Sequence, residues 1–412
     1  MARVSVFLIA VILIAGMAGC GSPPVEIRDW YDLDAVRDAL DDHYVLMNDL
    51  DSATSGYEEL ASPTANGGKS WQPIGTTAAP FTGRLDGQEY QIRDLFINRP
   101  EEEEGEVGLF GAVGKGGFVS NIGVVNANIL GYDDVGGVVG SNEGTMSNCY
   151  ATGNVSGHSK VGGLVGSNYD GTVTNSHSNG SMSGSSTVGG LVGFNRHLVR
   201  NSHSSASVRG TMVGGLVGNN WYEGTVSNSY STGNITGDES VYGYGEYVGG
   251  LVAGNNGDIT GSYSTGSVTG DNYIGGLLAY NVGGLTNSYS SASVTGSYCV
   301  GGLVGANSGS GVNNGVVSNS YSTGNVTGNS TVGGLVGRND EGTVSNSLWD
   351  METSGQASSD GGIGKNTTEM QDITTFSGTG WNIISVALNQ THPAYIWNIV
   401  NNATYPFLSW QL

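Results

Sequence analysis

Two histidines have the spacing that a metal-binding pair would require. His177 and His203 lie 26 residues apart, and each follows an Asn-Ser pair at a position where most copies of the surrounding sequence carry Tyr. Paired imidazoles can bind a transition metal. His158 and His197 fall elsewhere in the pattern and do not complete a ligand set. The sequence therefore favours histidine as a substitute for Tyr in a stacked polar-aromatic column, with a metal pair as the alternative.

Residues that could perform acid–base or nucleophilic catalysis are scattered. Between residues 132 and 347 there are 12 acidic and five basic residues, with no convincing carboxylate pair, P-loop, zinc spacing or nucleophile elbow. A β-helix enzyme that cleaves an acidic polysaccharide needs a basic proton acceptor, often with carboxylates that hold calcium. The sequence therefore predicts a non-catalytic protein without a cofactor or a bound metal. The five basic residues are Lys160, Arg196, Arg200, Arg209 and Arg338.

An asparagine recurs at one fixed place in the chain. It lies seven residues after the first Val or Ile of a word close to VGGLVG. Stacked strands bring equivalent positions to within about 4.8 Å of each other, so these amides are expected to form a structural ladder of hydrogen bonds. The eight members are Asn142, Asn168, Asn195, Asn220, Asn255, Asn281, Asn307 and Asn339.

Aromatic residues gather around the longest insertion in the pattern, in which Tyr alternates with Gly. Tyr247 and Tyr273 each come directly before a VGG-type word, so stacking would place them side by side. We expect an aromatic strip on one corner of the molecule, because exposed aromatic surface is a common signature of a glycan or protein contact. The alternative is that these rings pack the insertion against its own repeat. The candidate ligand surface consists of Trp221, Tyr222, Tyr242, Tyr244, Tyr247 and Tyr273.

The first twenty residues are predicted to be an export signal. Arg3 precedes an apolar stretch, residues 4–18, that is short for a membrane span. The stretch ends in GMAGC, which resembles the bacterial lipoprotein signal, although Met17 stands where that signal prefers Leu. The resemblance implies that Cys20 is lipidated, with 1–19 as the signal peptide and 20–28 as a lipid-anchored tether. A plain secretory signal is the alternative.

The two other cysteines, Cys149 and Cys299, are about five repeats apart. Stacked repeats would separate them by far more than the ~7 Å between Cα atoms that a disulfide allows. We interpret both as small residues at positions that hold Ser or Thr in other repeats.

The acidic charge of the chain excludes some classes of binding partner. The formal net charge is -22, and 19 of the 36 acidic residues lie between Glu26 and Glu106. Nucleic acid requires a basic footprint, and an anionic membrane surface would repel such a chain. We therefore expect no nucleic-acid partner and membrane contact through the lipid anchor only. The ligand indicated by the aromatic residues is a glycan or a cell-surface protein.

The repeated word defines the elements that must position these residues. Copies begin at nine places between Val107 and Val332, most of them 25 to 28 residues apart. Segments such as VVSNSYSTG alternate with strand periodicity, which puts Val317, Asn319 and Tyr321 on one face. Three short strands per repeat, separated by Gly and Asn turns, are typical of one rung of a β-solenoid, in which stacking buries a continuous core. The glycines of VGGLVG are expected to permit a corner or a close approach of backbone.

The whole phrase, GGLVG followed by Asn and then NSYSTGNVTG, resembles the GLUG motif repeat of exported bacterial and archaeal surface proteins. The resemblance covers residues 107–347, and the flanks, residues 71–97 and 348–381 with YPFLSW, are similar to segments that accompany such repeats. It implies a surface location and a scaffold or adhesive role. It carries no catalytic residues.

The sequence thus predicts an all-β, right-handed parallel β-helix-like solenoid of about nine rungs of ~26 residues. Residues 29–106 are expected to form an N-terminal cap and lead-in rungs, with a short helix after Asp29 and a first strand at 44–51. Residues 107–347 form the repeats, and 348–412 form a C-terminal cap that includes Trp381, Trp397 and Trp410. The expected function is that of an exported, membrane-anchored surface lipoprotein, on the cell surface or outer membrane, acting as a scaffold or adhesin. The alternatives are a carbohydrate-binding or carbohydrate-degrading β-helix, and a structural spacer without a ligand.

Overall fold

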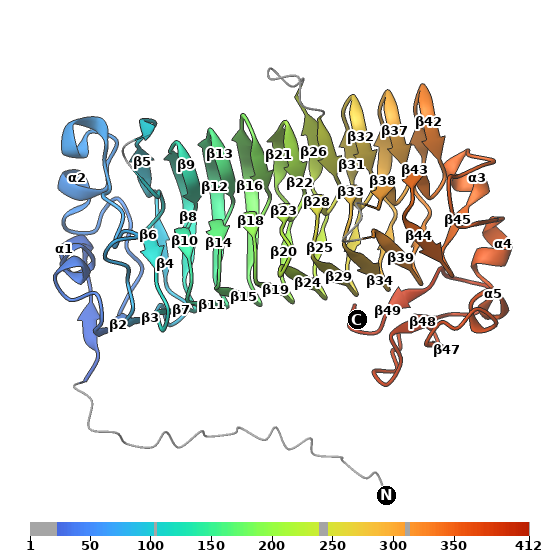
Figure 1. Cartoon of the computed structure of the whole chain (residues 1–412). Helices are drawn as coiled ribbons and strands as arrows, with labels where there is room; N and C mark the ends of the chain where they lie inside the picture. Colours follow the sequence, from blue (N-terminus) through green and yellow to red (C-terminus); the bar gives the residue numbers. More distant parts are fainter. Residues whose placement is uncertain (1–22, 103–104, 239–245, 310–313, 412) are drawn as a thin grey trace, which may run out of the picture.

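The computed structural model describes residues 23–102, 105–238, 246–309 and 314–411. Short strands stack in register along one axis, so that the chain forms a rod with helices at both ends (Figure 1). The strand pairs that join successive rungs are parallel. The predicted parallel β-helix is confirmed.

A complete rung of the rod contributes to four sheets, which we call A, B, D and C in the order in which the chain visits them. In one rung these are β11 (Thr145–Ser147), β12 (Tyr150–Gly157), β13 (Ser159–Gly162) and β14 (Val165–Asn168). Each strand pairs with the equivalent strands of neighbouring rungs, as in the register Val139 to Val165 to Val192 of sheet C. Equivalent residues are therefore stacked in columns along the rod.

Sheets A and C form two of the long sides. Sheet A contains β1 (Val25–Ile27), β2 (His43–Leu46), β3 (Arg84–Asp86), β7 (Phe118–Ser120), β11, β15 (Thr172–Thr174), β19 (Leu198–Arg200), β24 (Thr225–Ser227), β29 (Asp258–Thr260), β34 (Gly284–Thr286), β39 (Val316–Ser318) and β44 (Thr343–Ser345). Sheet C contains β6 (Phe110–Val113), β10 (Val139–Asn142), β14, β18 (Val192–Asn195), β23 (Val217–Asn220), β28 (Val252–Asn255), β33 (Leu278–Asn281), β38 (Val304–Ser308) and β43 (Val336–Asp340).

Sheets B and D form the remaining sides. Sheet B contains β4 (Gln91–Arg93), β5 (Phe96–Asn98), β8 (Gly123–Leu130), β12, β16 (His177–Gly184), β20 (His203–Ser204), β21 (Ser207–Gly210), β25 (Tyr230–Ser231), β26 (Asn234–Gly237), β30 (Tyr263–Ser264), β31 (Ser267–Thr269), β35 (Tyr289–Ser290), β36 (Ser293–Thr295), β40 (Tyr321–Ser322), β41 (Val326–Thr327), β45 (Leu348–Asp350) and β46 (Ile363–Lys365). Sheet D contains β9 (Asp133–Gly136), β13, β17 (Thr187–Gly189), β22 (Met212–Gly214), β27 (Tyr247–Gly249), β32 (Asn272–Gly275), β37 (Tyr298–Gly301) and β42 (Ser330–Gly333).

The prediction of three strands per rung is wrong, because the VGGLVG word itself contains two strands. In one copy β22 ends at Gly214 and β23 begins at Val217. A Cβ atom on Gly214 would overlap the carbonyl oxygen of Val217, and one on Gly215 would overlap the carbonyl oxygen of Gly250 in the next rung. The two glycines therefore form a corner, as expected, and they do so by dividing the word between sheets D and C.

The predicted alternation of Val317 and Tyr321 on one face is also wrong. Asn319 lies between β39 and β40 with φ 46°, a left-handed conformation that Asn tolerates better than most residues. The chain turns there, so that Val317, Ser320 and Ser322 are buried in the rod while Tyr321 lies on its outer side against the C-terminal segment. A simple period of two does not continue through such a corner.

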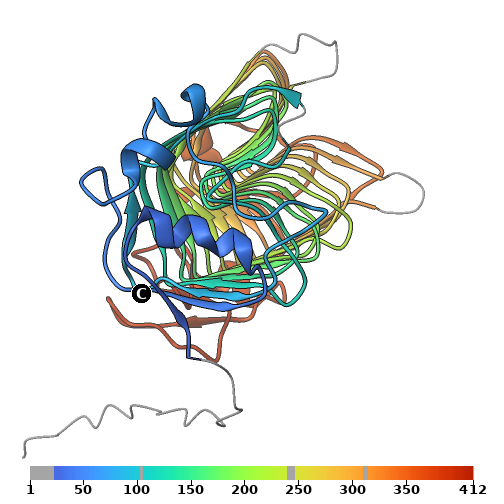
Figure 2. The same cartoon turned by 90° about the vertical axis from the view of Figure 1, so that its left-hand side faces the viewer.

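The N-terminal end of the rod is closed by helices (Figure 2). Asp29 caps α1 (Trp30–Asp34) by accepting a hydrogen bond from the Asp32 amide at 3.0 Å, and Trp30 and Leu33 are fully buried. The other short helices here are η1 (Ala35–Asp38), α2 (Tyr57–Leu60) and η2 (Ala65–Gly68). The predicted position of the first strand is corrected, because β1 at Val25–Ile27 precedes β2 and pairs with it. Residues 25–27 of the predicted tether therefore belong to sheet A.

The C-terminal segment covers both the end and part of one side of the rod. Three short helices follow the last rung, α3 (Met351–Ser354), α4 (Thr367–Met370) and α5 (Ile373–Ser377). The chain then forms a small sheet of β47 (Ile383–Ser385), β48 (Trp397–Ile399) and β49 (Phe407–Leu408). This sheet lies beneath the last rungs in Figure 1, so the segment is more than an end cap.

Candidate ligand surfaces

The eight asparagines of the repeated word form one continuous file inside the rod. Along it, each side-chain amide nitrogen donates to the side-chain oxygen of the next asparagine, at 2.7 to 2.8 Å. Most of these side chains also donate to a backbone carbonyl of the following turn, as Asn220 does to Gly224 at 3.0 Å. Seven of the eight are fully buried, and Asn339 at the C-terminal end of the file is partly exposed. This file fixes the turn between sheets C and A and is not a ligand surface.

A second column, of aromatic and imidazole rings, runs along the outer side of sheet B. Successive rings from Tyr150 to Tyr321 stack nearly parallel, with centroids 4.7 to 5.0 Å apart. His177 and His203 stack at 4.9 Å within it, which confirms that histidine substitutes for Tyr in this column. Burial lowers the pKa of both imidazoles, and the charge of His177 lowers that of His203 further.

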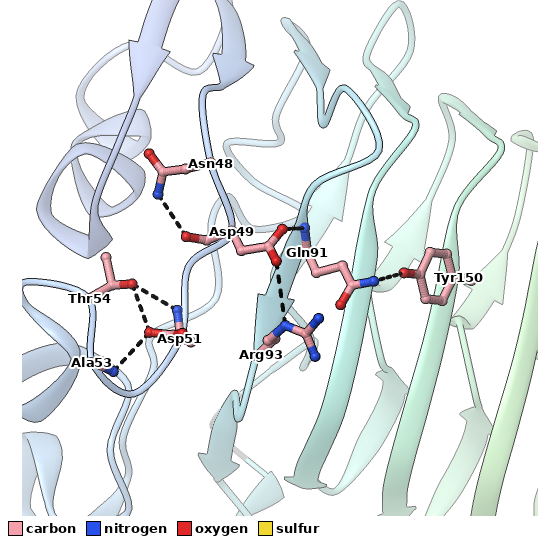
Figure 3. A network of polar contacts seen from close by, with 8 residues as sticks. All are labelled: Asn48, Asp49, Asp51, Ala53, Thr54, Gln91, Arg93 and Tyr150. Atoms are coloured by element: carbon pink, nitrogen blue, oxygen red, sulfur yellow. Dashed lines mark hydrogen bonds and ion pairs between the residues drawn. The ribbon is translucent and has the colours of Figure 1, made fainter.

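Both ends of the ring column are attached to neighbouring structure. At the N-terminal end, the Gln91 amide nitrogen donates to the Tyr150 hydroxyl at 2.6 Å, and Asp49 accepts from the Gln91 backbone amide at 2.9 Å (Figure 3). At the other end the C-terminal segment covers four rings. Trp410 lies against Tyr230 and Tyr263, with centroids 6.2 and 5.8 Å away. Trp397 lies against Tyr289 and Tyr321, with centroids 6.2 and 5.7 Å away.

The candidate aromatic strip divides into two groups on different turns of the rung. Tyr247 and Tyr273 stack at 5.0 Å on the outer side of sheet D, where Tyr280 of sheet C approaches Tyr247 to 5.8 Å. Trp221 and Tyr222 lie instead in the turn between sheets C and A, with their rings edge to face at 4.9 Å. The expectation of one strip on one corner is therefore wrong, because the insertion precedes sheet D whereas Trp221 follows sheet C.

The group at Trp221 is the more exposed of the two. Trp221 is 38% exposed and Tyr222 is 56% exposed, whereas Tyr247 and Tyr273 are half-buried and burial raises the pKa of both phenols. A hollow of about 500 Å³ lies directly beside Tyr222. It is within the usual size range of small-ligand sites.

The hollow beside Tyr222 is created by unequal turn lengths. The turns from sheet C to sheet A contain two residues in two consecutive rungs, 256–257 and 282–283, and longer turns flank them at 221–224 and 309–315. The short turns line the middle of the hollow, with Tyr222 and Glu223 on one side and Asn314 and Val316 on the other, and Glu223 and Asp258 contribute carboxylates. These two acidic residues were not among the predicted ligand-surface residues. The sequence does contain a signal for the hollow, because the number of residues between each ladder asparagine and the next strand differs from rung to rung.

Several predicted residues lie outside the described part of the chain or have no role in a site. Cys20, Tyr242 and Tyr244 are outside the described residues. Cys149 and Cys299 are buried free thiols, and Cys149 occupies a column of serines, as expected. Cys299 instead lies in a column between Tyr273 and Thr331. The expectation that this position holds Ser or Thr in other repeats is therefore met by one of its two neighbours.

The described residues contain neither a metal-binding cluster nor a helix that could cross a membrane. Within the described ranges, no group of three or more His, Cys, Asp or Glu side chains could hold a metal ion. None of the helices in this part of the chain has both the length and the hydropathy that crossing a membrane requires.

The repeats match a known family model. The GLUG motif matches residues 131–156, 157–183, 210–236, 244–269 and 296–327. The fold and these matches define a parallel β-helix built from short repeated rungs. The resemblance to GLUG repeats is confirmed, because the motif matches the chain in these five segments.

Two curated relatives share part of the repeat region. A halomucin of Haloquadratum walsbyi is 37% identical over 114 residues, which are 27% of this chain and 1% of that protein. A protein of Evansella cellulosilytica named "Putative Gly-rich membrane protein" is 35% identical over 141 residues, which are 33% of this chain and 15% of that protein. The chain thus spans a small fraction of the length of each relative.

Two solved structures are similar at low identity. An "IgA1 Protease" is 18% identical with a TM-score of 0.43, covering 66% of this chain and 21% of its own. A "putative immunoglobulin A1 protease" from Bacteroides ovatus is 17% identical with a TM-score of 0.42, covering 94% of this chain and 93% of its own.

Proposed function

We propose that the protein is a non-catalytic surface repeat protein that binds a glycan or a cell-surface protein through the side of its rod. The observation that carries the proposal is the exposed Tyr222, which lines a hollow of about 500 Å³ and whose ring contacts the exposed ring of Trp221. Aromatic side chains are the residues most enriched at binding surfaces, because they present large apolar area at a small cost in conformational entropy.

The charges around this hollow restrict the ligand. Glu223 and Asp258 line it, and Arg196, which approaches Glu223 to 3.9 Å, is the cation paired with this wall. An acidic polysaccharide would meet two carboxylates there. A neutral or cationic partner with hydroxyl or amine groups suits these acceptors. The relatives are named as a halomucin and a membrane protein, which supports an exported location. The net charge of -22 disfavours binding to nucleic acid, because it would repel the phosphate backbone.

We further propose that Cys20 carries the lipid that holds the protein at a membrane. The apolar stretch that ends at Cys20 supports this proposal, and two or more acyl chains would give stable anchoring. Mass spectrometry of the mature N-terminus tests it directly. We expect lipidated Cys20 in the parent and release of the protein in Cys20→Ala. An unmodified Cys20, or a mature N-terminus elsewhere, would exclude the anchor.

The ligand surface is tested with the soluble Cys20→Ala form. Binding to a glycan array and to whole cells is measured for the parent and for the double variant Trp221→Ala/Tyr222→Ala. We expect at least a tenfold loss of binding in the double variant with an unchanged melting temperature, because both rings are exposed and make few core contacts.

A matched control removes an exposed ring elsewhere. Tyr31 on α1 is 48% exposed at the N-terminal end, so Tyr31→Ala should bind as the parent does. Full binding by the Trp221→Ala/Tyr222→Ala variant would place the ligand surface elsewhere. A parent that binds neither glycans nor cells would favour a spacer without a ligand.

A further inference from the structure

We infer that a second hollow, between the C-terminal segment and the rod, is a binding site for an uncharged sugar residue. Its volume is about 450 Å³. One wall is the corner between sheets A and B, with Asn228, Gly261 and Asn287, and the other wall is the C-terminal segment, with Ile396 and Trp410. This site is separate from the hollow at Tyr222 and does not depend on the function proposed above.

The hollow arises where a column of asparagines is interrupted. The corner between sheets A and B carries Asn in eight described rungs, at 121, 148, 175, 201, 228, 287, 319 and 346, all with φ between 46° and 56°. Gly261 occupies this position between Asn228 and Asn287 with φ 57°. It keeps the left-handed backbone but has no side chain, so the column has a gap of one residue.

The gap separates Asn228 from Asn287, whose side-chain oxygen accepts a hydrogen bond from the Trp397 indole nitrogen at 3.4 Å. Two pairs of neighbouring asparagines in the column bond to each other, Asn148 to Asn121 at 3.0 Å and Asn201 to Asn175 at 3.3 Å. Asn228 and Asn287 are two rungs apart, or about 9.6 Å, which is too far for such a bond. Asn382 of the C-terminal segment adds a third amide to the lining, and its side-chain oxygen accepts a hydrogen bond from the Ile396 backbone nitrogen at 2.7 Å.

The C-terminal segment supplies the apolar part of the hollow. Trp410 is fixed there because its indole nitrogen donates to the Gly261 carbonyl at 3.2 Å and its ring lies against Tyr263. Ile396 is 39% exposed beside it. Ile396 lines the same hollow as Trp410 and the three amides, so it offers a surface for a methyl group or a ring face.

The chemistry of the lining selects the ligand. None of the twelve described residues that line the hollow is Asp, Glu, Lys, Arg or His. Amides both donate and accept hydrogen bonds, as sugar hydroxyls do, and an indole packs against the C–H face of a pyranose. An acetamido group would add an amide for Asn228 or Asn287 and a methyl group for Ile396. The site therefore fits a neutral pyranose best, and an N-acetylhexosamine in particular.

The test measures sugar binding to the full soluble chain with Cys20→Ala. Saturation-transfer NMR and calorimetry are performed with N,N′-diacetylchitobiose, lactose and a trigalacturonate. We expect binding of the neutral sugars, strongest for diacetylchitobiose, and none for the trigalacturonate. Gly261→Asn should weaken binding at least tenfold, because it fills the gap with the residue that other rungs carry at the same backbone angle.

Two further variants keep the result interpretable. Asn201→Gly makes the reverse exchange two rungs away in the same column and should bind as the parent does. Asn228→Gly removes one amide without backbone strain and should weaken binding even if Gly261→Asn melts early. The inference is overturned if neither neutral sugar binds, or if both hollow variants bind as tightly as Asn201→Gly. Loss of binding in Trp221→Ala/Tyr222→Ala would also overturn it, because that variant alters only the other hollow.

Discussion

At the scale of single residues, asparagine has two distinct uses in this rod. The ladder asparagines are buried and bond along the stack, which the regular sequence spacing predicted. The corner asparagines, such as Asn228, are outside the core and are there because they tolerate a left-handed backbone. The sequence shows both at constant spacing, so spacing alone could not separate a hydrogen-bonding role from a conformational one.

Replacement of one ladder asparagine should cost far more than its size suggests. In Asn220→Leu, the Asn195 amide nitrogen and the Asn255 side-chain oxygen would each lose a buried partner, at about 1–3 kcal/mol per group. We expect a free energy of unfolding at least about 2 kcal/mol lower, measured by urea denaturation. Asn201→Gly, at an exposed corner, is the control and should change stability little. Equal effects of the two variants would contradict a stabilising ladder.

The histidine pair should make the rod sensitive to acid. Burial lowers the pKa of His177 and His203 below the ordinary 6.5, so below pH 6.5 the unfolded chain binds more protons than the rod. Stability therefore falls as the pH drops through this window and levels off below the lowered pKa values. Melting temperatures at about pH 7.5 and 5 measure the effect.

His177→Tyr/His203→Tyr serves as the reference for that measurement, since it restores the residue of the other rungs. Carboxylates titrate in both proteins and cancel in the comparison. We expect the melting temperature of the double variant to fall less on acidification than that of the parent. An identical fall in both proteins would contradict the role of the imidazoles.

At the scale of elements, the repeat period predicted the stack, the register and the glycine corner. It did not predict that the VGGLVG word divides between two sheets or that the chain turns at Asn319, because both corners depend on backbone angles at single residues. The same limit applies to the sites. The exposure of Tyr222 and the hollow beside it depend on differences in turn length between adjacent rungs, and those differences matter only once the rungs are stacked.

Rungs should not be interchangeable along the rod, because the C-terminal segment contacts particular ones. Deletion of residues 161–187 joins Lys160 to Val188 in register with the rung before and lies outside the contacts of Trp397 and Trp410. Deletion of 274–299 removes Tyr289 and moves these contacts by one rung. We expect both variants to fold, with a clearly lower melting temperature for the second. Equal melting temperatures would show that the segment adds little stability.

At the scale of the whole molecule, the N- and C-terminal segments close the two ends of the stack. The two hollows are bounded by different parts of the chain. One hollow lies between turns of the rod itself, whereas the other exists because the C-terminal segment folds back over the rod. An open end of a parallel stack would present unpaired backbone groups to other chains. The C-terminal segment therefore has two structural roles, which truncation can separate.

Two truncations should have different outcomes. Removal of 348–412 takes away the segment whose Ser358, Ser359 and Asp360 bond to β43 and the corner that precedes it, so we expect aggregation. Removal of 381–412 leaves those bonds in place and exposes the rings from Tyr230 to Tyr321, so we expect a soluble rod that melts earlier. Light scattering and thermal denaturation distinguish them. Aggregation of neither variant would show that the last rung is protected in another way.

The column of buried serines that follow the corner asparagines should protect the chain from deamidation. Asn-Ser pairs in flexible peptides deamidate when the serine backbone nitrogen attacks the asparagine side chain. At each of five described corners, that nitrogen donates instead to the serine hydroxyl of the next rung, at 3.1 to 3.2 Å. The stack therefore holds the attacking nitrogen in place, and a sequence rich in Asn-Ser pairs can stay intact as long as its rungs remain stacked.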